Sequence, residues 1–576
     1  MKFTAFKIFF VAIFIAMLSS CEGYLDPGYD QTLTKSDVFS SYVYALNYVR
    51  TIYSYLPSGA FDETFMTDES KHTDEASPFL IMNNGSWTSR TYVGSWTWGH
   101  YYAGIRRVHI FLENVDKAMF LDDNTYKLTP SVNDTLRKQL RGEARFLRAF
   151  YYFELLKRFG DPSKNLGIPI VPEKVLTIND TLDFARNKYD ECVNYIVSDC
   201  DNAAAVLPVR RGGSDYGKAS KAAALALKSR VLLYAASPLA NPSGDVEKWK
   251  LAADAANDVI KLAAVVPVGS KSPTYKLTDK ATVSNDNMLS VFTTPDNDEV
   301  LFSSPVVQSN GFEASNLPPS LGGGGQINPT QDLVDAFESL TGYPITDPKS
   351  GYNPTNPYYR RDKRLAYFIA LNGSQYGVAV KDETPAQLAA RTLDTYVGGK
   401  DGFNSSKNAT KTGYYVRKFV DPNADIILNR KTATHFWVHF RYAEILLNYA
   451  EALAEIGNIS AAYDALKLIR DRAGLATPSA LKSLSKDDFL ERVRNERRVE
   501  LCFEGHRFWD VRRWKQGETY FNAPIHGMKI TKNGTTFTYE VFKVEDRVFD
   551  SKMYAMPLPY DEMQKSKLLK QNSGWE

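Results

Sequence analysis

Helical periodicity in long blocks is the feature that most limits what this chain can fold into. In residues 134–159, Leu136, Leu140, Leu147 and Leu155 recur at the spacing of one helix face. Gly160 and Pro162 follow, which predicts the end of this helix. Further blocks of the same kind cover roughly 184–206, 217–236, 246–263, 440–456, 459–473 and 486–504. The chain is therefore expected to be mainly α.

Two of these blocks form a pair with a recognisable pattern. Small Ala450 and Ala465 alternate with bulky Tyr449 and Tyr463 across a turn at Gly457. The unit has the length of a tetratricopeptide repeat, about 34 residues. Residues 217–263 are a looser copy. We expect degenerate tetratricopeptide-like helix pairs whose small residues let the helices approach and bury a common core.

Two stretches between the helical blocks have another composition. Residues 57–104 are polar and aromatic, and residues 264–435 are rich in Gly, Pro, Asn and Ser. The second stretch includes Gly322–Gly325, which we expect to be a flexible loop because no Lys and helix follow it as in a phosphate-binding loop. Long irregular segments usually carry binding surfaces. We therefore expect a helical scaffold with a loop-rich binding face and little β structure.

The first twenty residues predict export. Lys2 and Lys7 precede an apolar run over 8–18, and Ser19-Ser20-Cys21 follows. This order is typical of a signal peptide, and the run is shorter than the roughly 20 residues that span a bilayer. Leu-Ser-Ser-Cys resembles the lipobox of bacterial lipoproteins. We expect residues 1–20 to be removed and Cys21 to carry the acyl chains that anchor the protein.

The charge balance argues against a nucleic-acid partner, and the cysteine spacing argues against a disulfide between Cys192 and Cys200. The chain has 69 Lys and Arg against 67 Asp and Glu, and loss of Lys2 and Lys7 leaves equal numbers. A nucleic-acid partner would require a clustered basic excess, which is absent from the sequence. Cys192 and Cys200 lie eight apart on a predicted helix, about 12 Å, which is too far for a disulfide.

A dense group of charged residues lies near the C-terminus. It has two interpretations: a polar catalytic or anion-binding site, or a self-neutralising network of ion pairs along one helix and its exit. We favour the network because both signs alternate and aromatic residues interleave. The group consists of Arg494, Glu496, Arg497, Arg498, Glu500, Glu504, Arg507, Asp510, Arg512 and Arg513.

Catalytic and metal motifs are weak. His435 and His439 are four apart, but no Glu follows His435, and Phe436-Trp437 between them favours a strand. Adjacent carboxylates occur at Asp68-Glu69 and Asp74-Glu75, and a glycosidase needs two carboxyls about 5 to 9.5 Å apart. No nucleophile elbow or phosphate-binding motif accompanies them. We expect no catalysis, no metal and no cofactor.

Tryptophan provides the best candidates for a ligand site. An exposed indole face can cover the axial C–H bonds of a sugar while nearby polar groups bind its hydroxyls. Trp87, in a polar loop, is the first candidate and Trp96 the second, with Asn84 and Arg90 as neighbouring polar groups. The loop aromatics Phe312 and Tyr352 are further candidates.

Many segments in order resemble the SusD/RagB lipoproteins of Bacteroidetes, over nearly all of the mature chain. Trp98 matches a scaffold position of the family, so the resemblance implies that it lies in the core. His109 departs from the Asn usual in the family and is expected to be structural. The matching segments are Cys21–Asp26, Trp98–Asn114, Arg141–Ala149, Pro329–Phe337, Arg361–Leu365, Arg441–Glu444, Glu451-Ala452, Glu496–Leu501, Arg507–Asp510 and Leu569–Trp575.

The resemblance implies a non-enzymatic lipoprotein on the outer face of the outer membrane. It would bind a glycan or oligosaccharide and deliver it to a TonB-dependent (SusC-like) transporter. The expected organisation is a signal peptide (1–20), an N-terminal region (21–270) and a C-terminal region (271–576) in one structural domain. The alternatives are a peptide or other nutrient as ligand, a surface glycoside hydrolase, and a purely structural tetratricopeptide adaptor.

Overall fold

The computed structural model describes residues 34–59, 61–116, 129–267, 274–278, 287–377, 384–422, 424 and 432–576. The predicted signal peptide (1–20) and Cys21 lie outside these ranges. Within them, the chain contains no helix with the length and apolar character needed to cross a membrane.

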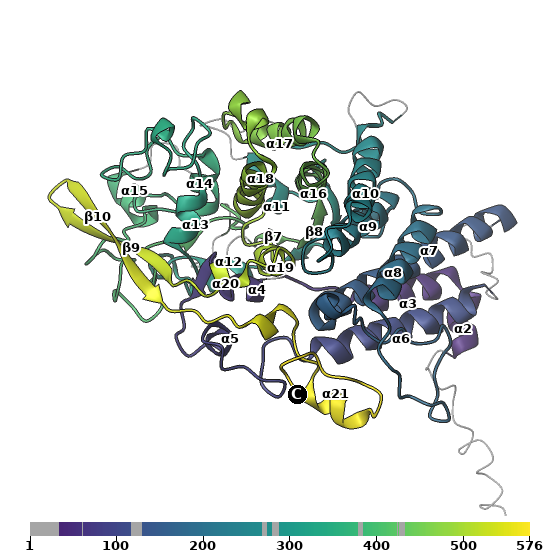
Figure 1. Cartoon of the computed structure of the whole chain (residues 1–576). Coiled ribbons are helices and arrows are strands. Elements are labelled where there is room, and N and C mark those ends of the chain that lie inside the picture. Colours follow the sequence, from purple (N-terminus) through teal and green to yellow (C-terminus); the bar gives the residue numbers. More distant parts are fainter. Residues whose placement is uncertain are drawn as a thin grey trace, which may run out of the picture.

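A stack of long helices forms one side of the molecule (Figure 1). Each helix packs on the next in the order α6 to α10, and α10 then packs on α16, which contacts both α17 and α18. The bounds are α6 (Thr97–Val115), α7 (Pro130–Phe159), α8 (Tyr189–Ala204), α9 (Lys221–Ala236), α10 (Val246–Ala264), α16 (Tyr442–Glu455), α17 (Ile459–Ala473) and α18 (Lys486–Glu500). The predicted helical blocks and the mainly α, tetratricopeptide-like class are confirmed.

The α16–α17 pair shows why the repeat pattern folds in this way. Gly457 adopts a positive φ of 84° in the turn, and the side chain of Asn458 accepts a hydrogen bond from the N–H of Ala461 to cap α17. Ala450 and Ala465 are buried between the helices. Because α10 packs directly on α16, the two predicted pairs are neighbours in space although about 180 residues of sequence separate them.

The remaining helices of the described chain are shorter. The first two pack on each other and on α6 and α7, and the others lie among the loops. In chain order, the remaining helices are α2 (Lys35–Ser40), α3 (Tyr42–Tyr53), α4 (Phe61–Phe65), α5 (Phe79–Asn83), α11 (Asn287–Thr293), α12 (Gly311–Asn316), α13 (Gln331–Ala336), α14 (Lys363–Phe368), α15 (Pro385–Arg391), α19 (Arg507–Arg513), α20 (Gly517–Tyr520) and α21 (Tyr560–Lys565). Phe503 and Gly505 have positive φ angles of 63° and 77°. The helix predicted over 486–504 therefore ends at Glu500 and turns into α19.

Among the described residues strands are few, as predicted, and every strand pair is antiparallel. Four short pairs fasten segments that are distant in sequence: β1 (Ser70–His72) with β4 (Ile327–Pro329), β2 (Val300–Ser303) with β8 (Val438–Arg441), β3 (Val307–Gln308) with β7 (Thr434–His435), and β5 (Ile369–Ala370) with β6 (Tyr415–Val416). The fifth pair is a long hairpin of β9 (Ile525–Asn533) and β10 (Thr536–Glu545) that projects from the end opposite the helical stack (Figure 1).

The sequence analysis did not identify this hairpin, although a local signal was present. Asn533-Gly534 lies between two runs of strand-forming residues, and an Asn-Gly pair in that context is typical of a two-residue hairpin loop. Gly534 has a φ of 63°, a conformation that is strained for other residues.

The glycine run is packed closely, which corrects the expectation of a flexible loop. A Cβ atom on Gly323 would lie 2.0 Å from the carbonyl oxygen of Leu317. The N–H groups of Gly324 and Gly325 donate to the carbonyls of Ala314 (2.8 Å) and Leu317 (3.0 Å). The glycines are therefore needed for close backbone approach.

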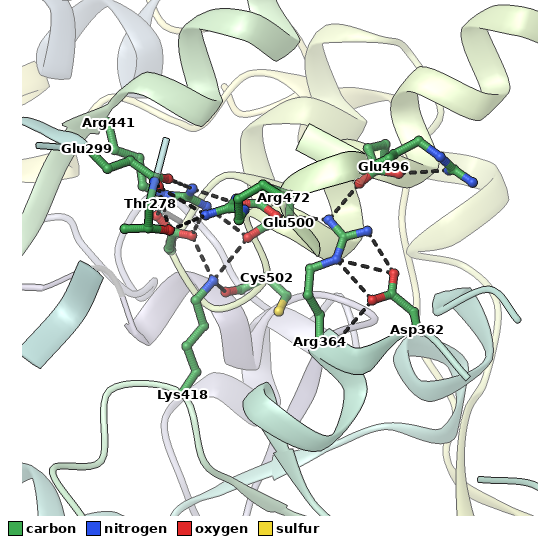
Figure 2. Close-up of polar contacts among 12 residues, drawn as sticks. Thr278, Glu299, Asp362, Arg364, Lys418, Arg441, Arg472, Glu496, Glu500 and Cys502 are labelled. Atoms are coloured by element: carbon green, nitrogen blue, oxygen red, sulfur yellow. Dashed lines mark hydrogen bonds and ion pairs between the residues drawn. The ribbon is translucent and has the colours of Figure 1, made fainter. Parts of the chain in front are cut away.

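Nine of the ten C-terminal charged residues form ion pairs, as the network interpretation predicts, and Figure 2 shows the buried part around Glu496 and Glu500. The exception is Arg512, which has no ion pair among the described residues. Arg364 Nη1 and Arg441 Nη1 lie 2.8 and 2.7 Å from Glu500 carboxylate oxygens, and Arg472 is also paired with it. Burial alone would raise the pKa of Glu500, but these guanidinium groups lower it below its usual range. Glu496 is likewise shared by Arg364 (2.6 Å) and Arg470 (2.9 Å).

The origin of the partners differs from the expectation. The prediction placed the ion pairs along one helix and its exit, but Arg364, Arg441 and Arg472 come from α14, the end of β8 and α17. Removing one member of such a network leaves an uncompensated buried charge, which typically costs about 3–5 kcal/mol. The network therefore joins the helical stack to the loop-rich part of the chain.

Candidate functional site

The first candidate site is a cavity of about 490 Å³, called cavity 1 here. It lies between the segment that joins α3 to α4, the start of α6, the end of α7 and α19. Its volume suits a small ligand. The lining residues are Ser54, Leu56, Pro57, Ser58, Gly59, Phe61, Asp62, Glu63, Met66, Val93, Gly94, Trp96, Thr97, His100, Tyr101, Arg158, Phe508, Trp509 and Met556.

Trp96 is the exposed aromatic residue of cavity 1. Its side chain is 66% exposed, and it immediately precedes α6. The ring contacts His100 edge to face, with centroids 5.1 Å apart. A ring nitrogen of His100 lies 3.1 Å from the carbonyl oxygen of Tyr55. This arrangement holds the indole at the edge of the cavity while leaving most of its surface accessible to a ligand.

Charged groups form another part of the cavity 1 wall. Arg158, in the last turn of α7, places Nη2 2.8 Å from Glu63 Oε1 and also pairs with Glu154. The guanidinium carbon lies 5.2 Å from the centre of the Trp509 ring. Desolvation, together with repulsion from Glu63, raises the pKa of the neighbouring Asp62. Cavity 1 thus combines an exposed ring with groups that donate and accept charge-assisted hydrogen bonds.

A second cavity, cavity 2, has about the same volume, 500 Å³. It shares a wall with cavity 1, made of Ser54, Leu56, Pro57, Ser58 and Phe61. Its other lining residues are Arg50, Tyr53, Phe292, Ser304, Pro305, Val307, Ser309, Phe312, Phe419, His435, Phe436 and Trp437.

Aromatic rings dominate cavity 2. The Phe61 ring lies 5.1 Å from Phe312, 5.4 Å from Phe419 and 4.9 Å from Trp437, between ring centroids. These are the tilted and edge-to-face geometries that aromatic pairs prefer.

Three polar side chains at cavity 2 have partners within the protein. His435 Nε2 lies 2.9 Å from Glu313, and Ser304 Oγ accepts a hydrogen bond of 2.8 Å from the Trp437 N–H. The Tyr53 hydroxyl donates to Glu143 at 2.8 Å. Cavity 2 therefore offers apolar surface and few free hydrogen-bonding groups.

Comparison with known proteins places the chain in a family. A family model described as "SusD family" matches residues 283–575, half of the chain. The chain belongs to the SusD family. A second model, described as "Starch-binding associating with outer membrane", matches residues 39–233. The resemblance predicted from the sequence is thus confirmed.

Relatives of this SusD-family chain extend over nearly its whole length. SusD-like protein P38 of Formosa agariphila is 23% identical over 547 residues, which are 90% of this chain and 93% of that protein. The crystal structure of a SusD-like protein from Bacteroides fragilis superposes with a TM-score of 0.76 at 28% identity, covering 93% of this chain and 98% of that one. A SusD-like carbohydrate binding protein from the same species shares the fold, with a TM-score of 0.70 at 23% identity over 92% and 100% of the two chains.

The first tryptophan candidate is corrected. Trp87 is 3% exposed, and its ring lies 4.4 Å from Trp575 and 6.2 Å from Tyr92. It belongs to the core and presents no face to a ligand. Trp98 is buried as predicted, with its ring 5.2 Å from Phe159. Of the predicted tryptophans, the structure places Trp96 at cavity 1.

Asn84 and Arg90 are exposed, but neither lines cavity 1 or cavity 2. Asn84 accepts a hydrogen bond of 3.0 Å from the Ser86 N–H within its own turn. The guanidinium carbon of Arg90 lies 3.7 Å above the Tyr560 ring. The structure therefore does not bring these two residues together with Trp96.

Phe312, one of the further aromatic candidates from the sequence, lines cavity 2. Tyr352 lines neither cavity and lies beneath Arg361, 5.4 Å from its guanidinium carbon. Sequence reasoning missed Glu63 and Arg158. A signal for Arg158 was its place among basic residues in the last turn of a long helix, but that pattern more often stabilises the helix dipole.

Asp68 and Glu69 do not form an accessible acid pair, whereas Asp74 and Glu75 are exposed but line neither cavity 1 nor cavity 2. Asp68 and Glu69 are 6% and 1% exposed. Asp68 is held by Arg507 (2.8 Å) and Arg498 (2.7 Å), which lower its pKa to about 2 against the effect of burial. Burial and the Asp68 charge raise the pKa of Glu69 to about 8. Neither carboxylate lines cavity 1 or cavity 2.

The two histidines considered as metal ligands lie on strands, as predicted. His435 is on β7 and pairs with Glu313, whereas His439 is on β8 and stacks 5.2 Å from the Phe302 ring. Across the described residues, no group of three or more His, Cys, Asp or Glu side chains is arranged to hold a metal ion.

Proposed function

We propose that this SusD-family protein binds a glycan or oligosaccharide at the cell surface and delivers it to a TonB-dependent outer-membrane transporter. The supporting observation is the exposed Trp96 ring at the edge of cavity 1, beside the Glu63–Arg158 pair. An indole face covers the C–H surface of a sugar ring, and the carboxylate and guanidinium bind its hydroxyls. The protein acts by binding, without catalysis.

Calorimetry against a panel of polysaccharides and peptides tests the ligand class. We expect one polysaccharide to bind the wild type and to lose affinity in Trp96→Ala. Binding of peptides alone contradicts a glycan ligand. Asn84→Ala and Arg90→Ala test whether a long glycan also contacts these exposed residues.

In this proposal the lipid anchor keeps the protein beside its transporter. Acyl chains on Cys21 hold it on the outer membrane, facing the exterior, at high effective concentration beside the transporter. The protein then closes over the barrel mouth as a lid. We expect Cys21→Ala to move the protein from the membrane fraction to the soluble fraction without changing its glycan affinity. A variant that stays in the membrane fraction contradicts the anchor.

Cavity 2 favours a second candidate, a peptide or other nutrient with an apolar group bound by the same lid mechanism. Its lining suits an apolar side chain better than a sugar, because the Phe61, Phe312, Phe419 and Trp437 rings dominate it. Peptide binding that survives Trp96→Ala and weakens in Phe312→Ala supports this candidate. A surface glycoside hydrolase is less favoured, and product analysis after long incubation of the wild type with the bound polysaccharide tests it.

A further inference from the structure

A third, much smaller cavity lies in the core at one end of α19. It has a volume of about 20 Å³, enough for one water-sized species. Its walls include Asn83, Trp87, Phe508, Arg512 and Arg547. It shares Met66 and Phe508 with the wall of cavity 1 but differs from both ligand cavities in size and in chemistry.

Arg512 is a buried cation without a counter-ion. The residue is 5% exposed, and its Nε and Nη1 donate to the carbonyl oxygens of Met553 (3.2 Å) and Phe508 (2.9 Å). Its guanidinium carbon lies 3.5 Å from the centre of the Phe508 ring. Throughout the described part of the chain, no carboxylate lies within ion-pair distance of it. Burial lowers the pKa of Arg512 to about 9, so the cation is retained at neutral pH.

Other walls of the cavity also provide donors. The indole N–H of Trp87 and Nη2 of Arg547 are buried, and neither has an acceptor among the described residues. Asn83 is already engaged, because its Oδ1 accepts from Arg547 Nη1 at 3.0 Å and its Nδ2 donates to the Phe65 carbonyl at 3.1 Å. An unpaired buried donor typically costs about 1–3 kcal/mol.

Charge around the cavity is also unbalanced. Glu545 is the carboxylate paired with Arg547, at 2.7 Å, and the same carboxylate is shared with Lys71. Two cations, Arg512 and Arg547, therefore line the cavity, and its described lining includes no carboxylate. A further negative charge in the cavity would restore part of the balance.

We propose that this cavity binds a single chloride ion. A halide accepts hydrogen bonds from several directions and donates none, which matches a lining that supplies indole and guanidinium donors. A water molecule could accept from two donors, but it would need acceptors for its own two hydrogens and would leave the Arg512 charge uncompensated. The ion would fasten α19 to the turn after α5 and to the segment after β10.

Thermal unfolding at constant ionic strength tests the site. Sodium chloride replaces sodium gluconate, whose anion is too large for the cavity. We expect the melting temperature of the full chain to rise with chloride and to saturate, by about 1–3 °C. Arg512→Met removes the dependence, whereas Arg210→Met, which alters an arginine paired with Asp296 and Asp298 on the surface, retains it. Equal melting temperatures of the wild type in the two salts overturn the proposal.

Two further measurements keep the test decisive if Arg512→Met does not fold. Trp87→Phe removes the indole donor and keeps an aromatic ring, and we expect it to raise the chloride concentration at half-saturation several-fold. Crystals grown in sodium bromide should show an anomalous peak within about 3.5 Å of the Arg512 guanidinium. An unchanged half-saturation in Trp87→Phe, or bromide peaks only elsewhere, overturns the assignment.

Discussion

Cavities 1 and 2 are nearly equal in volume, about 490 and 500 Å³, and share a wall made of residues 54, 56–58 and 61, yet they differ in chemistry. The common wall cannot explain this difference. Cavity 1 is completed by the ends of α6 and α7, which contribute Trp96 and Arg158, whereas cavity 2 is completed by α11, α12 and β7, which contribute aromatic rings. The opposite wall therefore decides what each cavity can bind.

The charged wall of cavity 1 is also part of the core, which gives the largest expected effect. Replacing Arg158 by Met leaves Glu154 and Glu63 without this partner in a site where Arg158 is 12% exposed. We expect the free energy of unfolding to fall by about 3–5 kcal/mol, measured by urea denaturation.

A control on the same helix separates burial from charge. Lys138 pairs with Asp134 on the surface of α7, with side chains 59% and 50% exposed. Lys138→Met should cost less than about 1 kcal/mol. Equal losses in the two variants would show that the cavity 1 wall is not supported by the buried ion pairs.

Trp96→Ala tests whether cavity 1 is the sugar site. Loss of the exposed ring should weaken glycan binding about tenfold or more, which corresponds to ~1.4 kcal/mol, because the apolar face of the sugar loses its contact. Stability should change by less than about 0.5 kcal/mol, since the side chain is exposed. Calorimetry and urea denaturation measure the two effects. Tyr359→Ala removes an aromatic side chain that is 68% exposed and lines neither cavity, so its affinity should equal that of the wild type.

Phe312→Ala tests whether cavity 2 binds apolar ligands independently of cavity 1. It removes one of the rings that surround Phe61 in cavity 2. We expect binding of an apolar probe such as N-acetyl-phenylalaninamide to weaken several-fold by calorimetry, because buried apolar contact area is lost. Glycan affinity should stay unchanged. Parallel losses for the sugar and the apolar probe would show that the two cavities act as one site.

The smallest effect is a pH dependence confined to cavity 1. Desolvation raises the pKa of Asp62, so its carboxylate forms at a higher pH than that of a free aspartate. Because the ionised form accepts stronger hydrogen bonds from sugar hydroxyls, glycan affinity should increase as the pH rises through this pKa. Asp62→Asn should remove that increase, and binding of the apolar probe in cavity 2 should not follow it. Calorimetry between pH 4 and 7 provides the measurement.

The sequence predicted the helical scaffold well because helix periodicity is a local property. The bounds of α7, α10 and α17 agree with the predicted blocks within a few residues. The ion-pair network was also predictable in kind, because alternating charges interleaved with aromatic residues favour it. Its partners on α14 and β8 were not, because only tertiary structure brings them to α18.

The candidate site was harder to predict from the sequence than the scaffold, because its residues also come together only in the tertiary structure. Trp87 ranked above Trp96 because its immediate neighbours in sequence are polar, yet it packs on Trp575 at the other end of the chain. Local polarity carries no information about such a partner. The walls of both cavities likewise come from segments far apart in sequence, so no spacing rule could have grouped Trp96 with Arg158.

The ion pair between Asp68 and Arg507 can form only after most of the chain has been synthesised, because its two residues lie far apart in sequence. The two residues are separated by 439 positions, which ribosomes translate in roughly 20 to 90 s. Throughout that interval the carboxylate next to the α4 segment lacks this cation. The loops that carry both cavities therefore acquire their final support only when the C-terminal part of the chain has been made. A chain truncated before Arg507 would contain the long helices but would lack this support for the loops that carry the binding face.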